Sequence, residues 1–130
     1  MKYRTFKKTG LQVSEVGLGC WQLGGDCLGD LDESTAKSIL ETSVDAGVNF
    51  LDTADVYGDG RSEEFIGQFI KDHPESLKVA TKLGRRAHVF PDQFTHANLL
   101  GCTEDSLKRL GVETIDLTQL HCPPTTVLRQ

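Results

Sequence analysis

Short apolar runs alternate with amphipathic helical segments along this chain, and this alternation constrains the fold more than any other feature. The runs cover residues 16–21, 48–51, 77–82 and 115–120. Parallel neighbouring strands need a crossover connection, and a helix between successive strands supplies it. The alternation therefore predicts an α/β fold with a parallel sheet. Two architectures remain, an open doubly wound sheet or the front half of a (β/α)8 barrel.

Apolar periodicity and end signals predict three helices. Their apolar faces comprise Ala36, Ile39, Leu40 and Val44 in the first, Phe65, Ile66, Phe69 and Ile70 in the second, and Leu99, Thr103, Leu107 and Leu110 in the third. Asp32 and Ser62 are the predicted N-caps of the first two helices, because their side-chain oxygens can accept a hydrogen bond from a free backbone N–H. Gly47, Pro74 and Gly111 are predicted to end the three helices.

An amphipathic hairpin is predicted before the first apolar run. Residues 3–6 and 11–14 alternate in polarity around residues 7–10, where Gly10 can supply the turn. Strands with one apolar face need something to cover it. We therefore expect the hairpin to form a lid on a larger body.

Composition excludes several classes of partner. The chain has 130 residues, of which 38% are apolar, which suits one soluble domain with a modest core. Its net charge of -5, with acids and bases interspersed, leaves no basic stripe for nucleic acid or an anionic membrane surface. No apolar run approaches the roughly 18 residues of a membrane span, and no signal-peptide pattern follows Met1. We therefore predict a cytoplasmic location.

The cysteines predict free thiols. Cys20, Cys27, Cys102 and Cys122 lie far apart and form no C-x-x-C pair. This spacing favours neither a zinc knuckle nor a disulfide framework. Free thiols are typical of a reducing compartment.

Polar side chains gather where the predicted strands end. Asp52, Lys82 and His121 each close a different strand, and Tyr57 lies on the loop that leaves the second strand. Each residue alone has a structural explanation, such as a turn cap for Asp52 or a lysine that extends to solvent for Lys82. Because parallel strands point the same way, all four side chains should reach one rim of the sheet. That shared position favours a functional site.

Such a set of groups suits proton donation. A free tyrosine has a pKa of about 10, and a lysine cation beside it favours the phenolate and lowers that value. Asp52 would keep Lys82 charged and oriented, while His121 would hydrogen-bond a carbonyl oxygen. The sequence therefore predicts a pocket in which Tyr57 protonates a developing alkoxide.

A metal hydrolase built on Asp52, Asp55 and His121 is a weaker hypothesis. The two aspartates lack companion histidines at ligand spacing. The remaining histidines fall on predicted helix ends or loops: His73, His88 and His96. We therefore expect no metal site.

Three motifs resemble those of the aldo-keto reductase family. They are Asp52-Thr53-Ala54-x-x-Tyr57-Gly58-x-Gly60-x-Ser62-Glu63, Thr81-Lys82 and Leu120-His121-x-Pro123. The resemblance extends from the hairpin at residues 6–11 to the final residues and so covers essentially the whole chain. It implies the first half of a (β/α)8 TIM barrel, with an N-terminal hairpin across the base and about four strands and three helices.

The family resemblance also implies a reaction. It implies hydride transfer from NADPH to a small aldehyde or ketone, with Tyr57 as the general acid, Lys82 and Asp52 as its tuning pair, and His121 as the group that orients the substrate. Trp21 resembles a position that lines the substrate and nicotinamide pocket of the family, and the alternative is that it is a core aromatic residue. The expected cofactor contacts are Gly19, Cys20, Trp21 and Asp52. No G-x-G-x-x-G motif is present, and the family binds its cofactor without one.

The chain departs from the family in its extent. We expect one aldo-keto reductase domain over residues 1–130, truncated after the fourth barrel strand. Most cofactor contacts of the family come from the second half of its barrel. Unpaired edges at the first and fourth strands favour self-association. Of three explanations, a fragment or truncated product with weak or no activity alone is favoured over an inactive relic or a half-barrel that pairs with a second copy.

A function of another class stays open. The chain could be a non-catalytic reductase-like module that acts through protein–protein contacts, because barrel folds host many functions. Failure to bind NADPH, together with a stable stoichiometric partner, would favour this alternative.

Overall fold

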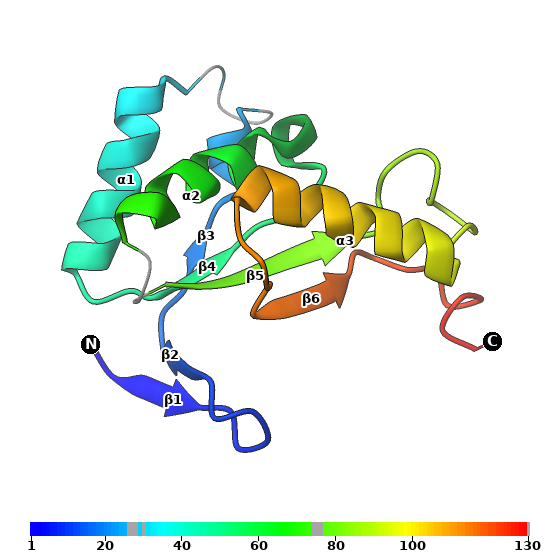
Figure 1. Ribbon diagram of the computed structural model, residues 1–130, viewed down its shortest axis with the longest axis horizontal. Helices are drawn as coiled ribbons and strands as arrows, with labels where there is room; N and C mark the ends of the chain where they lie inside the picture. Colours follow the sequence, from blue (N-terminus) through cyan, green and yellow to red (C-terminus); the bar gives the residue numbers. More distant parts are fainter. Residues whose placement is uncertain (26–28, 30, 74–76, 130) are drawn as a thin grey trace.

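The fold comprises a hairpin followed by alternating parallel strands and helices. A computed structural model describes residues 1–25, 29, 31–73 and 77–129. The strands are β1 (Tyr3–Thr5), β2 (Gln12–Ser14), β3 (Leu18–Gly19), β4 (Phe50–Asp52), β5 (Lys78–Leu83) and β6 (Leu117–Leu120). The helices are α1 (Glu33–Asp45), α2 (Arg61–Asp72) and α3 (His96–Leu110), and two short 3-10 helices are η1 (Trp21–Gly24) and η2 (Tyr57–Gly60) (Figure 1).

The sheet has the order β3-β4-β5-β6, and all its neighbours are parallel. All three α-helices cover the same face of this sheet (Figure 1). A doubly wound sheet carries helices on both faces, whereas a barrel wall carries them on its outer face alone. The structure therefore selects the barrel from the two predicted architectures. The edges of the sheet are β3 and β6. Self-association through these edges stays a prediction.

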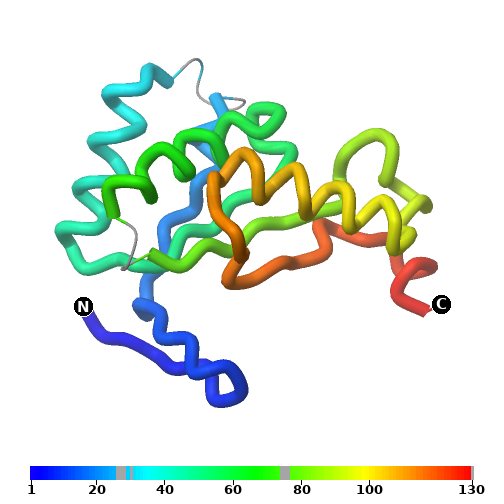
Figure 2. The backbone as a smooth tube through the Cα atoms, viewed as in Figure 1, coloured from blue at the N-terminus to red at the C-terminus, as the bar shows by residue number. Residues whose placement is uncertain are grey.

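The hairpin lies at the amino ends of the sheet strands, as predicted (Figure 2). Its two strands pair antiparallel, with Tyr3 opposite Ser14. The Tyr3 hydroxyl donates to the carbonyl oxygen of Gly47 at 2.9 Å, and the Ser14 N–H donates to Asn49 Oδ1 at 2.7 Å. Both contacts lie just before β4, so the hairpin covers the base of the barrel wall and leaves the opposite rim open.

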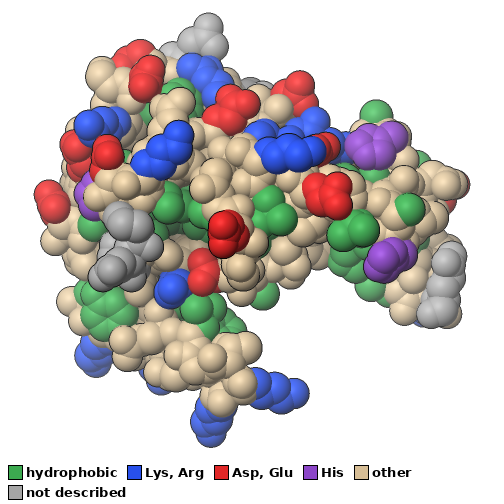
Figure 3. Space-filling view, in the orientation of Figure 1, with side chains coloured by type: hydrophobic (Ala, Val, Ile, Leu, Met, Phe, Trp, Pro, Cys, Tyr) green, Lys and Arg blue, Asp and Glu red, His purple; other side chains and the backbone are tan. Residues whose placement is uncertain are grey.

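The face of the sheet away from the helices borders an open groove. The groove runs between the hairpin and the sheet, and its lining includes Phe6, Val13, Phe50, Leu117 and Gln119. In the space-filling view the molecule is hollowed beside the hairpin (Figure 3). No helix in the described part of the chain is long and apolar enough to cross a membrane.

The helix ends that the structure describes follow the predicted signals, except at the start of α2. Asp32 caps α1, because its carboxylate accepts a hydrogen bond from the Thr35 N–H at 2.9 Å. The prediction that Ser62 caps α2 is wrong: this helix begins at Arg61, after Gly60. Gly111 ends α3 with a φ of 66°, as predicted, whereas Pro74 lies outside the described residues.

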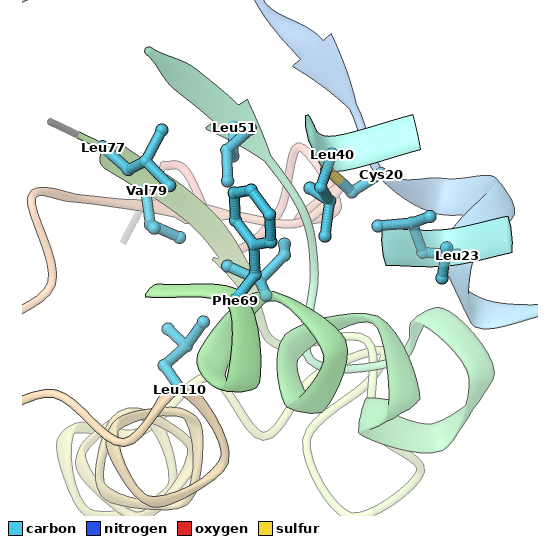
Figure 4. Close-up of a cluster of buried hydrophobic side chains, with 10 residues drawn as sticks. Cys20, Leu23, Leu40, Leu51, Phe69, Leu77, Val79 and Leu110 are labelled. Carbon is cyan, nitrogen blue, oxygen red and sulfur yellow. The ribbon is translucent and has the colours of Figure 1, made fainter. Parts of the chain in front are cut away.

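The main core lies between the sheet and the helices. In Figure 4, Phe69 of α2 points toward Leu51, Leu77 and Val79. The buried members of this core are Cys20, Leu23, Ala36, Leu40, Leu51, Ile66, Phe69, Leu77, Val79 and Leu110. The apolar faces predicted for α1 and α2 contribute to this core, either buried or partly buried.

The buried face of α3 differs from the predicted one. Cys102 and Ser106 are buried with Leu110, whereas Leu99 and Leu107 are only partly buried. Cys102 packs with Leu83 and Val89 in a second buried cluster, and Leu99 lies against that cluster. Where α3 meets α2, a Cβ atom on Gly67 would lie 2.5 Å from the Arg109 carbonyl oxygen, so the two backbones touch there.

Candidate active site

The four predicted site residues meet at the open rim of the sheet. Asp52 is the last residue of β4, Lys82 is the penultimate residue of β5, and His121 follows β6. Tyr57 begins η2, which connects β4 to α2. The parallel register places Gly19 of β3 beside Asp52, so the end of the first strand joins the same rim.

Lys82 is held by groups from β4. Its ammonium forms an ion pair with the Asp52 carboxylate and donates to the Thr53 carbonyl oxygen at 3.0 Å. The lysine side chain is only 19% exposed. Its Nζ lies 5.4 Å from the centre of the Tyr57 ring, over the ring face. The structure thus brings the predicted cation next to the predicted acid.

Two further rings flank Tyr57. The His121 ring meets it edge-on, with centroids 5.9 Å apart and an interplanar angle of 90°. The Trp21 ring lies 6.5 Å away at 47°. Trp21 is 47% exposed, so it is not a core residue. These contacts leave the Tyr57 ring partly buried, with rings on two sides of it.

A backbone contact joins the turns that carry Trp21 and Tyr57. A Cβ atom on Gly24 would lie 2.6 Å from the Gly58 nitrogen, and one on Gly58 would collide with the Gly24 carbonyl oxygen. Gly58 also has a φ of 59°, which glycine adopts without strain. The absence of side chains at both positions therefore lets η1 and η2 pack backbone to backbone.

Buried hydrogen bonds support the rim from below. The Ser62 hydroxyl, placed inside α2, donates to the Cys20 carbonyl oxygen at 2.7 Å and lies 2.8 Å from the Thr53 hydroxyl. Cys20 donates its N–H to the Asp52 carbonyl oxygen at 2.8 Å. Ser62 thus connects the ends of β3 and β4. Its place in the family motif was the one sequence signal for this role.

A buried ion pair lies below the start of α2. Glu63 is fully buried, accepts a hydrogen bond from the Thr81 hydroxyl at 2.5 Å, and pairs with Arg109 Nε at 2.7 Å. Sequence reasoning missed this pair. The two residues come from different helices, and no local pattern connects them.

The expected cofactor positions differ in accessibility. Gly19 is open, since a Cβ atom there would meet nothing within 4 Å, and the Asp52 side chain is 41% exposed. Cys20 is completely buried, and burial raises the pKa of its thiol to about 12. Cys20 can therefore contribute only by positioning its neighbours Gly19 and Trp21. The open rim and the exposed Trp21 ring fit a flat cofactor group.

The described residues form no cluster of ligands that would support the metal-hydrolase hypothesis. Within residues 1–25, 29, 31–73 and 77–129, no three His, Cys, Asp or Glu side chains gather as ligands. Asp52 is engaged by Lys82, and the Asp55 carboxylate is buried beside Arg86.

His121 occupies an environment that favours its neutral form. Its backbone N–H donates to the Leu83 carbonyl oxygen at 2.8 Å, and its Nδ1 is buried without a hydrogen-bond partner in the described part of the chain. Burial, assisted by the charges of Lys82 and Arg85, lowers the pKa of His121, and Asp52 acts against this shift. This environment favours the neutral imidazole.

We expect the His121 ring to titrate below the ordinary histidine value of 6.5, as followed by NMR of its imidazole. The unfolded chain binds a proton on His121 more readily than the folded chain does. The free energy of unfolding should therefore decrease as the pH falls below 6.5. A Lys82→Met variant should raise the midpoint, because it removes a neighbouring positive charge. A midpoint at or above 6.5 in the unsubstituted protein would contradict this environment.

The chain matches aldo-keto reductases in sequence. Residues 15–128 match the Aldo/keto reductase family. Aldo-keto reductase YhdN of Bacillus subtilis is 37% identical over 131 residues, which cover 98% of this chain and 40% of that protein. A probable voltage-gated potassium channel subunit beta of Oryza sativa is 35% identical, over 97% of this chain and 39% of that protein.

Solved structures agree with these matches. The holo form of an aldo-keto reductase from Bacillus halodurans has a TM-score of 0.77 and 36% identity, over 93% of this chain and 40% of that one. An aldo-keto reductase from Klebsiella pneumoniae in complex with NADPH has a TM-score of 0.75 and 27% identity, over 95% of this chain and 40% of that one. This chain thus spans about 40% of the length of these relatives. The matches confirm the predicted fold, the first part of a (β/α)8 barrel, and the chain belongs to the aldo/keto reductase family of oxidoreductases.

Proposed function

We propose that this protein reduces an aldehyde or ketone with NADPH, with Tyr57 as the general acid. The observation that carries the proposal is the position of Lys82, whose Nζ is held by Asp52 and lies 5.4 Å from the Tyr57 ring. NADPH is proposed because relatives of this fold have been solved with NADPH or NADP bound. When bound, NADPH supplies the hydride that reaches the carbonyl carbon.

The residues of the rim divide the proton chemistry among them. Tyr57 gives its phenolic proton to the carbonyl oxygen as negative charge develops there. The Lys82 cation stabilises the phenolate that remains, and Asp52 keeps that cation in place. His121, as a neutral imidazole, donates a ring N–H to the same oxygen and so fixes the direction from which Tyr57 approaches it.

The cofactor is proposed to lie along the open rim. Gly19 allows a close approach of the nicotinamide to the end of β3, and the exposed Trp21 ring offers a flat surface. Asp52 lies beside Gly19 in the neighbouring strand, and its side chain is 41% exposed. Because the chain spans about 40% of its relatives, we propose that turnover is weak, but not zero, when this chain is assayed alone.

Transfer of an isotopic label tests the reaction. NADPH deuterated at the transferred position is incubated with the protein and a simple aldehyde, and the alcohol is analysed by mass spectrometry. We expect the deuterium on the former carbonyl carbon, because the hydride moves directly. NADPH binding is measured in parallel by titration. Absence of labelled alcohol from protein saturated with NADPH would contradict the proposed reaction.

One observation favours the non-catalytic alternative. Relatives from Oryza sativa and Arabidopsis thaliana are each named a probable voltage-gated potassium channel subunit beta, which is a subunit name and not an enzyme name. A module of that kind would form a stoichiometric complex with a partner protein and fail the deuterium assay. The labelled alcohol therefore discriminates between the two functions.

A further inference from the structure

Arg86 contacts the Tyr57 turn on both sides of the tyrosine. It lies on the loop after β5, and one guanidinium nitrogen donates to the Asp55 carbonyl oxygen at 2.5 Å. Another donates to Asp59 Oδ1 at 2.6 Å. These acceptors lie two residues before and two residues after Tyr57. One rigid, planar group therefore spans the turn with two separate nitrogens, whereas an ammonium would have to reach both acceptors from a single nitrogen on a flexible stem.

The conformation of this turn needs such support. Asp59 has a φ of 56°, a left-handed conformation that costs energy for any residue with a side chain, although aspartate tolerates it better than most. The Asp59 side chain is 91% exposed, so contacts from a core do not hold it. Gly58 of the turn also packs against Gly24 through its backbone. Arg86 and Gly24 thus both contact the turn.

Arg86 also faces a buried charge. The Asp55 carboxylate is completely buried, and its oxygens accept no hydrogen bond of ordinary geometry from the described residues. Arg86 Nε lies 3.8 Å from Asp55 Oδ2. Burial raises the pKa of this carboxyl, and the Arg86 guanidinium acts against that rise. Removal of the cation would leave the carboxylate uncompensated, so a useful test must keep a positive charge at this position.

We propose that Arg86 is the positioning residue of Tyr57, because it joins the two ends of the turn that presents the phenol to the rim. The proposal rests on the proposed function, in which Tyr57 is the general acid. Among the described residues, the contacts to the Tyr57 ring come from Lys82, His121 and Trp21, whereas Arg86 contacts Asp55 and Asp59. Its effect on catalysis is therefore indirect, through the backbone of residues 55–59.

Amide hydrogen exchange tests this role without any assay of activity. In the turn, the Tyr57 N–H donates to the Ala54 carbonyl oxygen at 3.2 Å and the Asp59 N–H to the Val56 carbonyl oxygen at 3.2 Å. An Arg86→Lys variant keeps the charge beside Asp55 but loses the planar fork whose separate nitrogens contact the two acceptors. We expect both amides to exchange about tenfold faster in this variant, by NMR, while amides in α3 keep their rates.

The neighbouring arginine provides the matched control. Arg85 is exposed and lies over the Phe90 ring, so Arg85→Lys should leave the exchange of the turn unchanged. Equal rates in the Arg86→Lys and Arg85→Lys variants would overturn the proposal. An equal rise in the turn and in α3 would also overturn it, because it would show a general effect on stability.

Enzyme kinetics separate this proposal from the proposed reaction. In carbonyl reduction, Arg86→Lys should lower kcat and leave the aldehyde KM unchanged, because the acid is displaced while the pocket persists. If kcat/KM falls only because KM rises, while kcat is unchanged, the result would argue against a positioning role. Inactivity of the unsubstituted protein would contradict the proposed reaction, and the exchange rates would still decide whether Arg86 holds the turn.

Discussion

Replacement of Tyr57 by phenylalanine is expected to lower the rate of carbonyl reduction by about 10²–10⁴-fold, the range that a positioned general acid contributes. The variant keeps the ring that meets His121 and Trp21, so the pocket retains its walls and loses only the donated proton. Single-turnover measurement of NADPH oxidation reports the chemical step directly. Titration should show unchanged affinity for NADPH.

The second tyrosine of the chain supplies the control. Tyr3 lies on the hairpin, where its hydroxyl donates to the Gly47 carbonyl oxygen at the base of the sheet. A Tyr3→Phe variant loses one exposed hydrogen bond and should reduce carbonyls at the rate of the unsubstituted protein. If Tyr57→Phe matches Tyr3→Phe in rate, Tyr57 is not the acid.

Removal of the Arg109 charge should have the largest effect on stability. Glu63 is fully buried, and Arg109→Met leaves its carboxylate without the cation that it contacts at 2.7 Å. Loss of one partner of a buried ion pair typically costs about 3–5 kcal/mol. The free energy of unfolding, measured by urea titration, should fall by that amount.

The adjacent lysine is the matched comparison for Arg109. Lys108 pairs with Asp105 at 3.3 Å on the surface, where both side chains are more than half exposed. Exposed pairs contribute about 0–1 kcal/mol, so Lys108→Met should change stability little. A double variant, Glu63→Gln with Arg109→Met, should regain part of the loss, because it removes the unpaired charge as well. Equal stability of the two single methionine variants would refute the role of the buried pair.

The sequence predicted the elements of the rim because their signals are local. Apolar runs and helical periodicity set the order of strands and helices, and parallel strands bring their carboxyl ends to one edge. The meeting of Asp52, Lys82 and His121 at one rim could therefore be predicted before the structure was known. Their catalytic roles stay predictions, which the Tyr57→Phe experiment and its companions address.

The contacts behind the rim were not predictable in the same way. Ser62 matches the pattern of a helix cap, but α2 begins one residue earlier, and its hydroxyl contacts Cys20 and lies beside Thr53 in the interior. Arg86 reads as an ordinary loop cation until the fold brings it to the Tyr57 turn. Such roles depend on pairs of residues far apart in sequence, for which a single chain carries no periodic signal.

The contact between Gly24 and Gly58 has a consequence for how this protein can change through evolution. A methyl group on either glycine would collide with the backbone of the opposite turn, so the contact persists only while both positions are glycine. A substitution at one position therefore requires a withdrawal of the other turn, which would carry Trp21 or Tyr57 with it. The two glycines should be inherited together in active relatives, and lineages that lose one should lose the paired geometry of both rings.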